Sequence, residues 1–187
     1  MIEVRFHCRG GQGAVVGAVI LAKAALKDGK YAQSLPLFGA ERRGAAVQAF
    51  LRVDDKRIYL KDVVLEPDYV VVFDAGLIKT GAAQVDKGLK KGGWILINSP
   101  QDPKEFDMFP NHSVATVDAS AIAVKHRLGS AQAPIANAAM VAAFARLSDL
   151  VSLDSLLPAV EKEVPVKKEA NIAAAKEAYD APIRTDE

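Results

Sequence analysis

Short apolar runs alternate with helical segments along most of this chain. Apolar and charged residues alternate in residues 3–8, which predicts a strand with one exposed face. Residues 14–27 place apolar side chains at helical spacing and include several alanines, so this helix would present a thin face that lies close to a sheet. Asp28 and Gly29 end the helix, and residues 30–35 can return as a second strand. The chain therefore opens as strand, glycine turn, helix and strand.

The alternation continues through the rest of the chain. Residues 45–53 predict a third strand, whereas residues 69–73 and 94–98 are continuous apolar runs, which are typical of strands buried on both faces. Later segments predict one more strand and four helices, at residues 114–117, from about 119, 138–147, 153–163 and 170–179. Asp118 and Asn137 are expected to cap the helices that follow them. Strands alternating with helices in this way predict an α/β fold.

We expect a Rossmann-like, mostly parallel sheet with flanking helices, a β excursion after the second strand and a helical C-terminal arm. Residues 1–150 would form one α/β domain, and residues 151–187 would form the arm, docked on the same domain or on a partner. With 187 residues, of which 50% are hydrophobic, the chain can bury a substantial core.

Composition narrows the chemistry that this chain can perform. Met1 leads directly into an amphipathic strand and no apolar stretch could span a bilayer, so we expect a cytoplasmic protein with no signal peptide and no membrane contact. The single cysteine excludes an internal disulfide, a four-thiolate zinc site and an iron–sulfur cluster. We therefore predict no metal site and place any redox centre on a partner. The basic residues do not alternate with exposed aromatic residues, so nucleic acid is not expected to bind.

The turn at residues 8–13, Cys-Arg-Gly-Gly-Gln-Gly, carries the main ligand-binding signal. Glycines at the start of a helix free backbone N–H groups to face an anion, and the helix N-terminus adds partial positive charge. Gly11, Gly13 and Gly17 have the spacing G-x-G-x-x-x-G, not the dinucleotide pattern G-x-G-x-x-G, and the second strand lacks a terminal acidic residue. NAD binding is therefore disfavoured. The alternative to a ligand site is a turn that serves only close packing.

A second unusual segment is Pro-Leu-Phe-Gly-Ala-Glu-Arg-Arg-Gly at residues 36–44. Arg42 and Arg43 could neutralise a phosphate or carboxylate, with Phe38 beside them. Residues 1–60 carry ten Lys and Arg against five Asp and Glu, while the remainder carries fourteen against eighteen, so positive charge concentrates near both unusual segments. A subunit-contact loop anchored by Phe38 is the alternative, and the two roles are compatible.

Candidate catalytic residues are few, and we predict none on this chain. His7 is expected to be a core histidine with one hydrogen bond, and Cys8 a small buried residue, unless exposure beside a helix N-terminus lowers its pKa. His112 and His126 stand alone in the sequence, so they do not predict a metal site. Asp74 follows a buried strand, where it would cap a turn or, alternatively, face a ligand.

Three separated motifs carry a resemblance to a known family. They are R-G-G-Q-G-A at residues 9–14, P-L-F-G-A-E-R-R-G at residues 36–44 and P-I-A-N-A-A-M-V-A-A-F-A at residues 134–145. The chain resembles the gamma subunit of 2-oxoacid:ferredoxin oxidoreductases of the pyruvate and 2-oxoisovalerate type. The similarity also includes E-P-D-Y-V at residues 66–70 and extends in the same order from Met1 to about Leu147.

The resemblance implies a role in converting a 2-oxoacid and coenzyme A to acyl-CoA and carbon dioxide, with electrons passed to ferredoxin or a related acceptor. It implies that thiamine diphosphate, its magnesium and the iron–sulfur clusters belong to partners: a thiamine-binding beta-type subunit, an alpha-type subunit and a ferredoxin-like delta-type subunit. This chain would hold part of coenzyme A. The residues expected to face it are Arg9, Gly10, Gly11, Gln12, Gly13, Phe38, Arg42, Arg43 and Gly44.

Two other functions remain open at this point. The chain could be a purely structural interface subunit of the same complex, in which case replacing Arg42 and Arg43 would weaken assembly without changing the dependence on coenzyme A. It could also be an independent nucleotide-dependent reductase, which would retain a flavin or pyridine nucleotide on purification. The missing ribose-binding acid argues against the reductase.

Overall fold

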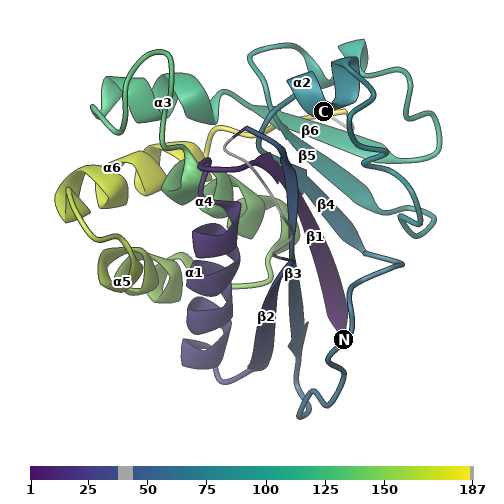
Figure 1. The fold of residues 1–187 in the computed structure, drawn as a ribbon. Helices are drawn as coiled ribbons and strands as arrows, with labels where there is room; N and C mark the ends of the chain where they lie inside the picture. The colour runs from purple at the N-terminus through teal and green to yellow at the C-terminus, as the bar shows by residue number, and fades with distance from the viewer. Residues whose placement is uncertain (38–43, 186–187) are drawn as a thin grey trace.

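The computed structural model describes residues 1–37 and 44–185, which form one seven-stranded sheet with most of the helices gathered on one of its faces (Figure 1). The strands are β1 (Ile2–Arg9), β2 (Tyr31–Leu37), β3 (Ala46–Asp54), β4 (Tyr69–Val72), β5 (Trp94–Asn98), β6 (Ser113–Val117) and β7 (Ile183–Arg184). The helices are α1 (Ala14–Lys27), α2 (Gly76–Lys79), the 3₁₀ helix η1 (Pro103–Glu105), α3 (Ala119–Lys125), α4 (Asn137–Ser148), α5 (Leu153–Glu163) and α6 (Lys168–Tyr179).

The strand order is β2-β3-β1-β4-β5-β6-β7. Strands β1, β4, β5 and β6 pair in parallel, whereas β3 runs antiparallel between β1 and β2, and β7 runs antiparallel along β6. In a Rossmann sheet the second strand would lie beside the first. Here β3 occupies that place and β2 moves to the edge, which is the β excursion expected from the sequence. The predicted α/β fold is confirmed.

The helical layer covers the sheet face shown at the left of Figure 1. Helix α1 packs on the sheet and on α4, which is buried along most of its length. The Phe144 ring of α4 packs against two rings of the sheet in edge-to-face geometry. Its centroid lies 6.3 Å from that of Phe6 in β1 and 5.4 Å from that of Tyr69 in β4. Edge-to-face ring pairs of this kind contribute about 1 kcal/mol to stability in addition to the free energy gained from the apolar area that they bury. The face is therefore closed by apolar contacts.

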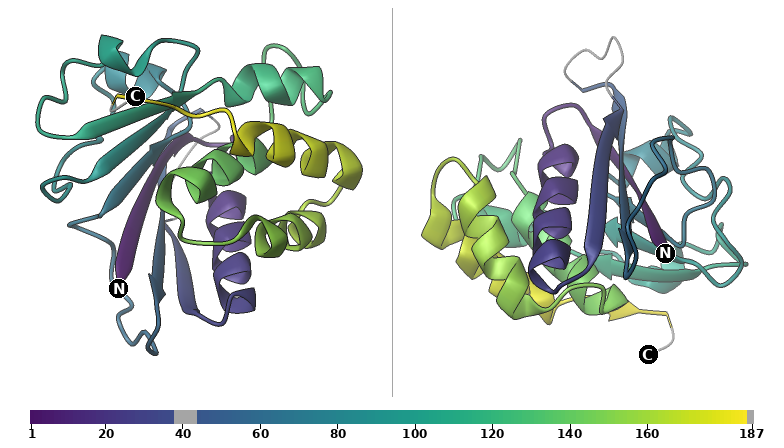
Figure 2. Two further views of the ribbon diagram at one scale, coloured as in Figure 1. Left: turned by 180° about the vertical axis from the view of Figure 1, so that it is seen from behind. Right: turned by 90° about the horizontal axis from the view of Figure 1, so that it is seen from below.

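Helices α5 and α6 form an outer row over this layer, as Figure 2 shows. Helix α5 packs against α1, and α6 packs against α4 and α3. Their side chains Leu156, Val160 and Ala174 belong to the same apolar core as the sheet. The chain then adds β7 to the sheet edge. The division into residues 1–150 and 151–187 stays a prediction.

The opposite face of the sheet is covered mainly by loops. Valine and isoleucine side chains of β4, β5 and β6 pack there against apolar side chains from the connections, namely Val85, Leu89, Phe106 and Phe109. Towards β1 and β3 the covering changes, because buried Arg5 and Arg52 donate hydrogen bonds to loop carbonyls. This face therefore relies on polar contacts in addition to apolar ones.

The two predicted helix caps have different outcomes. Asp118 caps α3, since its Oδ1 accepts a hydrogen bond from the Ala121 N–H at 2.8 Å. The prediction for Asn137 was wrong, because α4 begins at Asn137 itself and Ala136 occupies the cap position. Buried Asn137 instead faces Gly13, and this contact brings the starts of α1 and α4 together.

Candidate functional site: a cavity beside the glycine turn

The glycine turn follows β1 and leads into α1. Gly11 and Gly13 have φ angles of 97° and 84°, in the left-handed region that glycine adopts without strain. A Cβ atom on Gly13 would lie 3.1 Å from Asn137 Nδ2, whereas one on Gly11 would meet no atom within 4 Å. Gly13 thus allows close packing of two helix starts, and Gly11 borders open space. The close packing considered from the sequence is present at Gly13, and the ligand role of the turn stays a prediction.

The backbone donors of the turn divide into two groups. The Gly10 N–H donates to the Ala45 carbonyl at 2.9 Å, and the Gln12 N–H donates to the Arg9 carbonyl at 3.1 Å. The N–H groups of Gly11 and Gly13 have no acceptor among the described residues, and no side chain caps α1. The Gly10 and Gln12 N–H groups therefore hold the turn, whereas Gly11, whose N–H lacks an acceptor among the described residues, lines the cavity.

Arg9 and Gln12 are tied to Asp74 at the end of β4. Asp74 Oδ2 accepts from Arg9 Nε at 2.8 Å and from Gln12 Nε2 at 3.2 Å, while its Oδ1 caps the next turn by accepting from the Gly76 N–H at 2.8 Å. The predicted cap is confirmed, but the ion pair was not foreseen. Arg9 Nη1 also donates to the Gly44 carbonyl at 3.2 Å. The carboxylate therefore compensates the charge of Arg9 at the rim of the cavity.

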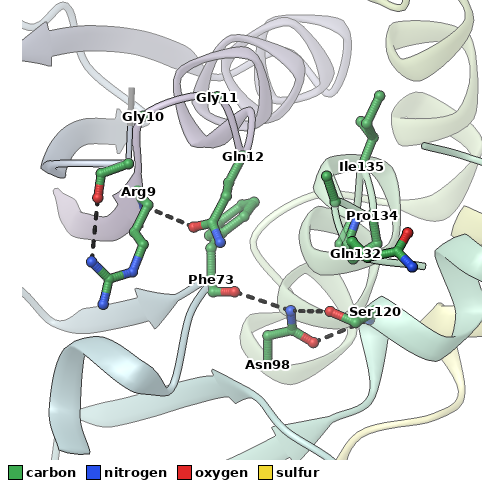
Figure 3. A pocket seen from close by; sticks show the side chains of 13 residues that line it. Arg9, Gly10, Gly11, Gln12, Phe73, Asn98, Ser120, Gln132, Pro134 and Ile135 are labelled. Atoms are coloured by element: carbon green, nitrogen blue, oxygen red, sulfur yellow. Dashed lines mark hydrogen bonds between the residues drawn. The ribbon is translucent and has the colours of Figure 1, made fainter. Parts of the chain in front are cut away.

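A cavity of about 390 Å³ opens beside the turn, between it and residues 132–136 (Figure 3). Arg9, Gly10, Gly11, Gln12 and Gly44 line it on the side of the turn. The cavity lies where β1, β4 and β5 end at their carboxyl sides, which is the usual ligand position in open parallel sheets.

Asn98 and Ser120 form the polar part of the opposite wall. Asn98 Nδ2 donates to the Phe73 carbonyl at 3.0 Å and to Ser120 Oγ at 2.9 Å, and its Oδ1 accepts from the Ser120 N–H at 3.2 Å. Because Ser120 Oγ accepts from Asn98, its own proton remains to be donated to a ligand oxygen. The wall thus offers a fixed hydroxyl donor opposite the amides of the turn.

Sequence reasoning missed this wall. The position of Asn98 at the carboxyl end of a buried strand is the signal that could have found it, because ligands of parallel sheets collect at such ends. Gln132 had no signal in the sequence, and Ile135 lies in the motif at residues 134–145, which was given no site role; both reach the cavity from a loop. Of the predicted residues, Phe38, Arg42 and Arg43 lie outside the described residues.

His7 and Cys8, just before the turn, are core residues. His7 is 2% exposed and its Nε2 accepts from Arg5 Nε at 3.1 Å. Desolvation, followed by the nearby Arg5 charge, lowers its pKa to about 4. Burial raises the pKa of Cys8 to about 11, although the Ala14 N–H opposes that change. At neutral pH both side chains are uncharged, so neither is an activated nucleophile or acid.

Other candidate groups are not assembled into a reactive site. His126, which stands alone in the sequence, has one partner in the structure, since its Nε2 lies 2.8 Å from Glu177 Oε2. Within residues 1–37 and 44–185, no group of three or more His, Cys, Asp or Glu is placed to hold a metal ion. No helix in this part of the chain is long and apolar enough to cross a membrane.

Comparisons with known proteins match the chain along almost its whole length. The family described as pyruvate ferredoxin/flavodoxin oxidoreductase matches residues 3–181. The pyruvate synthase subunit PorC of Methanocaldococcus jannaschii is 46% identical over 185 residues, and 98% of each chain is covered. The pyruvate/ketoisovalerate oxidoreductases common subunit gamma of Thermococcus kodakarensis is 45% identical over 188 residues, again with 98% of each chain covered.

Solved structures give the same assignment. The pyruvate oxidoreductase subunit PORC of Thermotoga maritima is similar with a TM-score of 0.82 at 31% identity, and 98% of each chain is covered. A 2-oxoglutarate:ferredoxin oxidoreductase from Magnetococcus marinus shares the fold over 30% of its own chain, with a TM-score of 0.71 at 19% identity, and its structure contains 2-oxoglutarate, coenzyme A and succinyl-CoA. The chain therefore belongs to the pyruvate ferredoxin/flavodoxin oxidoreductase family, in which it is a gamma subunit.

Proposed function

We propose that this gamma subunit binds part of coenzyme A in the cavity beside the glycine turn of an assembled, cytoplasmic 2-oxoacid:ferredoxin oxidoreductase. The observation that carries the proposal is the Gly11 N–H, which has no acceptor among residues 1–37 and 44–185 and belongs to a residue that lines a cavity at the carboxyl ends of the parallel strands; the Gly13 N–H, likewise without an acceptor in this part of the chain, lies two residues further along. A structure with the same fold contains coenzyme A. Pyruvate or a branched-chain 2-oxoacid would be the other substrate, as the names of the relatives state for those proteins.

The donors around the cavity suit a phosphate group. The amides of Gly11 and Gly13 carry the partial positive charge of the α1 N-terminus, and Ser120 supplies a hydroxyl proton from the other wall. Anions bound in this way need no full charge from the protein. A diphosphate or a phosphate monoester of coenzyme A would satisfy all three donors.

Arg9 alone does not give the rim of the cavity a net positive charge that would attract an anionic ligand. Asp74 compensates the Arg9 charge, so this pair adds little net potential. Arg42 and Arg43 remain the proposed source of positive charge, with Phe38 proposed to contact the ligand beside them. These assignments follow the loop motif in the sequence, and the base of that loop is joined to the turn by the hydrogen bond from Gly10 to Ala45.

The redox centres belong on partner chains in this proposal. The lone cysteine is buried with a raised pKa, so it cannot hold an iron–sulfur cluster. We assign thiamine diphosphate with its magnesium to a beta-type subunit and the clusters to a ferredoxin-like delta-type subunit, with an alpha-type subunit completing the assembly. This chain then contributes the coenzyme A cavity and subunit interfaces, and it is not active alone.

A matched pair of glycine substitutions tests the proposal. Gly11 and Gly29 are both exposed, both have positive φ angles, and a Cβ atom on either would meet no atom within 4 Å. Gly11→Val and Gly29→Val therefore introduce similar backbone strain, but only the first places bulk at the cavity. Gly13→Val is less informative because it also forces a side chain against Asn137.

The two variants are compared in the assembled complex by 2-oxoacid oxidation with a viologen acceptor and by calorimetric titration of coenzyme A. In Gly11→Val the added side chain would keep a phosphate away from the Gly11 N–H, and loss of that hydrogen bond is expected to raise the Kd and KM for coenzyme A about tenfold or more, with Gly29→Val unchanged. Equal coenzyme A affinity in both variants would reject the cavity as its site. A structural subunit predicts that Arg42→Ala with Arg43→Ala changes only assembly, and an independent reductase predicts a nucleotide retained by the isolated chain.

A further inference from the structure

Asp74 is connected to the cavity without lining it. Its carboxylate reaches the turn through Arg9 and Gln12, and both of these residues do line the cavity. We infer that Asp74 is a positioning residue, which sets the conformation of the glycine turn so that its free amides face the ligand. The inference rests on the proposed coenzyme A site.

The hydrogen bonds around Asp74 form a closed ring. Gln12 Oε1 accepts from the Arg9 backbone N–H at 2.7 Å, and Gln12 Nε2 donates to Asp74 Oδ2 at 3.2 Å. Arg9 Nε completes the ring by donating to the same oxygen at 2.8 Å. Both polar atoms of the Gln12 amide are therefore used inside the protein. Its side chain folds back and fixes the turn, and it does not need to touch the ligand.

The ring also reaches the returning end of the loop at residues 36–44. Arg9 Nη1 donates to the Gly44 carbonyl at 3.2 Å, and the Gly44 N–H lies 3.4 Å from the Gly10 carbonyl. Asp74 holds the guanidinium that makes the first of these contacts. One carboxylate thus orients three elements: the glycine turn, the base of the loop and, through the Gly76 N–H, the start of α2.

Charge explains why a carboxylate is needed at this place. Arg9 and Asp74 are partly buried, and hydrogen bonds between charged groups are roughly twice as strong as neutral ones. A neutral amide at position 74 would keep the shape and one acceptor but would hold Arg9 less firmly. The guanidinium would then be free to change rotamer, and the turn would sample conformations in which the Gly11 amide no longer borders the cavity.

Asp74→Asn tests the inference in the assembled complex. Asp102→Asn is its matched control, because Asp102 accepts from the N–H two residues ahead at 2.8 Å, as Asp74 does, and the described residues show no Arg or Gln donating to it. We expect Asp74→Asn to raise the Kd of coenzyme A, measured by calorimetry, about tenfold. The KM of the 2-oxoacid and the melting temperature should stay near the control values.

A double-mutant cycle identifies the route of the effect. If Asp74 acts through Arg9, then Arg9→Met added to Asp74→Asn raises the Kd little further, whereas independent roles give multiplied effects. Gln12→Met removes the other two hydrogen bonds of the ring, to the Arg9 N–H and to Asp74, and should also weaken coenzyme A binding. Multiplied effects, or a melting temperature that falls while the Kd is unchanged, would overturn the positioning role.

The glycine variants separate this inference from the proposed function. If Gly11→Val weakens coenzyme A binding and Asp74→Asn does not, the cavity remains the site and only the role of Asp74 is wrong. If Gly11→Val leaves the Kd of coenzyme A unchanged, the proposed site itself is rejected, whatever Asp74→Asn does.

Discussion

The two faces of the sheet are covered in different ways. Helices α1 and α4 close one face with alanines, other small residues and the Phe144 ring. Loops close the other face, and there two buried arginines reach across: Arg52 Nη1 donates to the Asp62 carbonyl at 2.6 Å, and Arg5 Nη2 donates to the Val85 carbonyl at 3.0 Å. One face is closed mainly by apolar packing, the other by packing with buried charge.

The difference follows from where backbone hydrogen bonds are made. A helix satisfies its own N–H and carbonyl groups, so it needs only close packing against the sheet. A loop leaves carbonyl oxygens that must find donors when they are buried. An arginine offers five donors on one side chain, and its flat guanidinium can bridge several carbonyls. The loop-covered face therefore needs buried cations, and their loss should cost more than a small misfit on the helical face.

Arg52→Met should have the largest effect on stability. Arg52 is 4% exposed and its Nε donates to Glu3 Oε1 at 2.8 Å, so its removal leaves a carboxylate and two loop carbonyls without their donor. Lys90 Nζ lies 3.8 Å from Glu3 Oε2 and would still compensate part of the Glu3 charge. We therefore expect a loss of about 3 kcal/mol in the free energy of unfolding, at the lower end of the range for a broken buried ion pair. Urea unfolding of the isolated chain measures it.

Arg57→Met is the matched control for that substitution. Arg57 is exposed and lies over the Tyr59 ring, with 5.5 Å from its Cζ to the ring centroid. Its loss should change the free energy of unfolding by about 0.5–1 kcal/mol. Equal effects of the two substitutions would show that the loop-covered face does not depend on the buried arginine.

Gly17→Ala probes the packing of the helical face and should have the next largest effect. A Cβ atom at Gly17 would lie 2.9 Å from Val141 Cγ1, and a valine in a helix has little rotamer freedom to move away. The gain in helix propensity, about 1 kcal/mol, offsets part of the strain. We expect a net loss of about 1–2 kcal/mol in the free energy of unfolding. Adding Val141→Ala should recover part of the Gly17→Ala loss in a double-mutant cycle, and additive losses would argue against a direct contact.

The sequence predicted most of the helical face and little of its opposite. Periodic apolar positions located α1 and the helices that follow the sheet strands, because a helix shows its buried face at regular spacing. A Cβ atom at Gly17 would lie 2.9 Å from Val141 Cγ1 of α4 and 3.6 Å from the Phe73 ring, which directly follows β4, and the contact with α4 had no signal in the sequence. Arg5 and Arg52 gave no signal, since their alternation with apolar residues is also that of exposed charges on a strand.

The candidate site was predictable only in part for a similar reason. The glycine turn was predicted because glycines directly before a helix are a local sequence signal for a tight turn with positive φ angles. The Asp74 ring and the Asn98–Ser120 wall are formed by residues from three or more elements that lie together at the sheet edge. These residues are far apart in the sequence, so no local pattern predicts that they are neighbours. The prediction that Gln12 faces coenzyme A stays a proposal, and in the structure its side chain is bound to the Arg9 backbone and to Asp74.

A pH titration has a smaller expected effect than Arg52→Met or Gly17→Ala, and it tests the polar covering around Arg5. His7 Nε2 accepts from Arg5 Nε, so the folded protein holds the neutral ring, and its pKa is lowered to about 4 by desolvation and then by the Arg5 charge. The unfolded chain binds a proton near pH 6.5. Between these values the unfolded state carries more protons, so stability is complete above about pH 6.5 and falls as the pH falls towards 4.

Lowering the pH from 7.5 to 6 should therefore reduce the free energy of unfolding by about 0.8 kcal/mol through His7 alone. This window lies above the usual pKa values of carboxylates, which limits their contribution. His7→Gln keeps an acceptor for Arg5 but does not titrate, so the difference in slope between the wild type and this variant isolates the histidine. Parallel slopes in urea unfolding would mean that the folded protein tolerates a charged His7, and that the covering near Arg5 admits water.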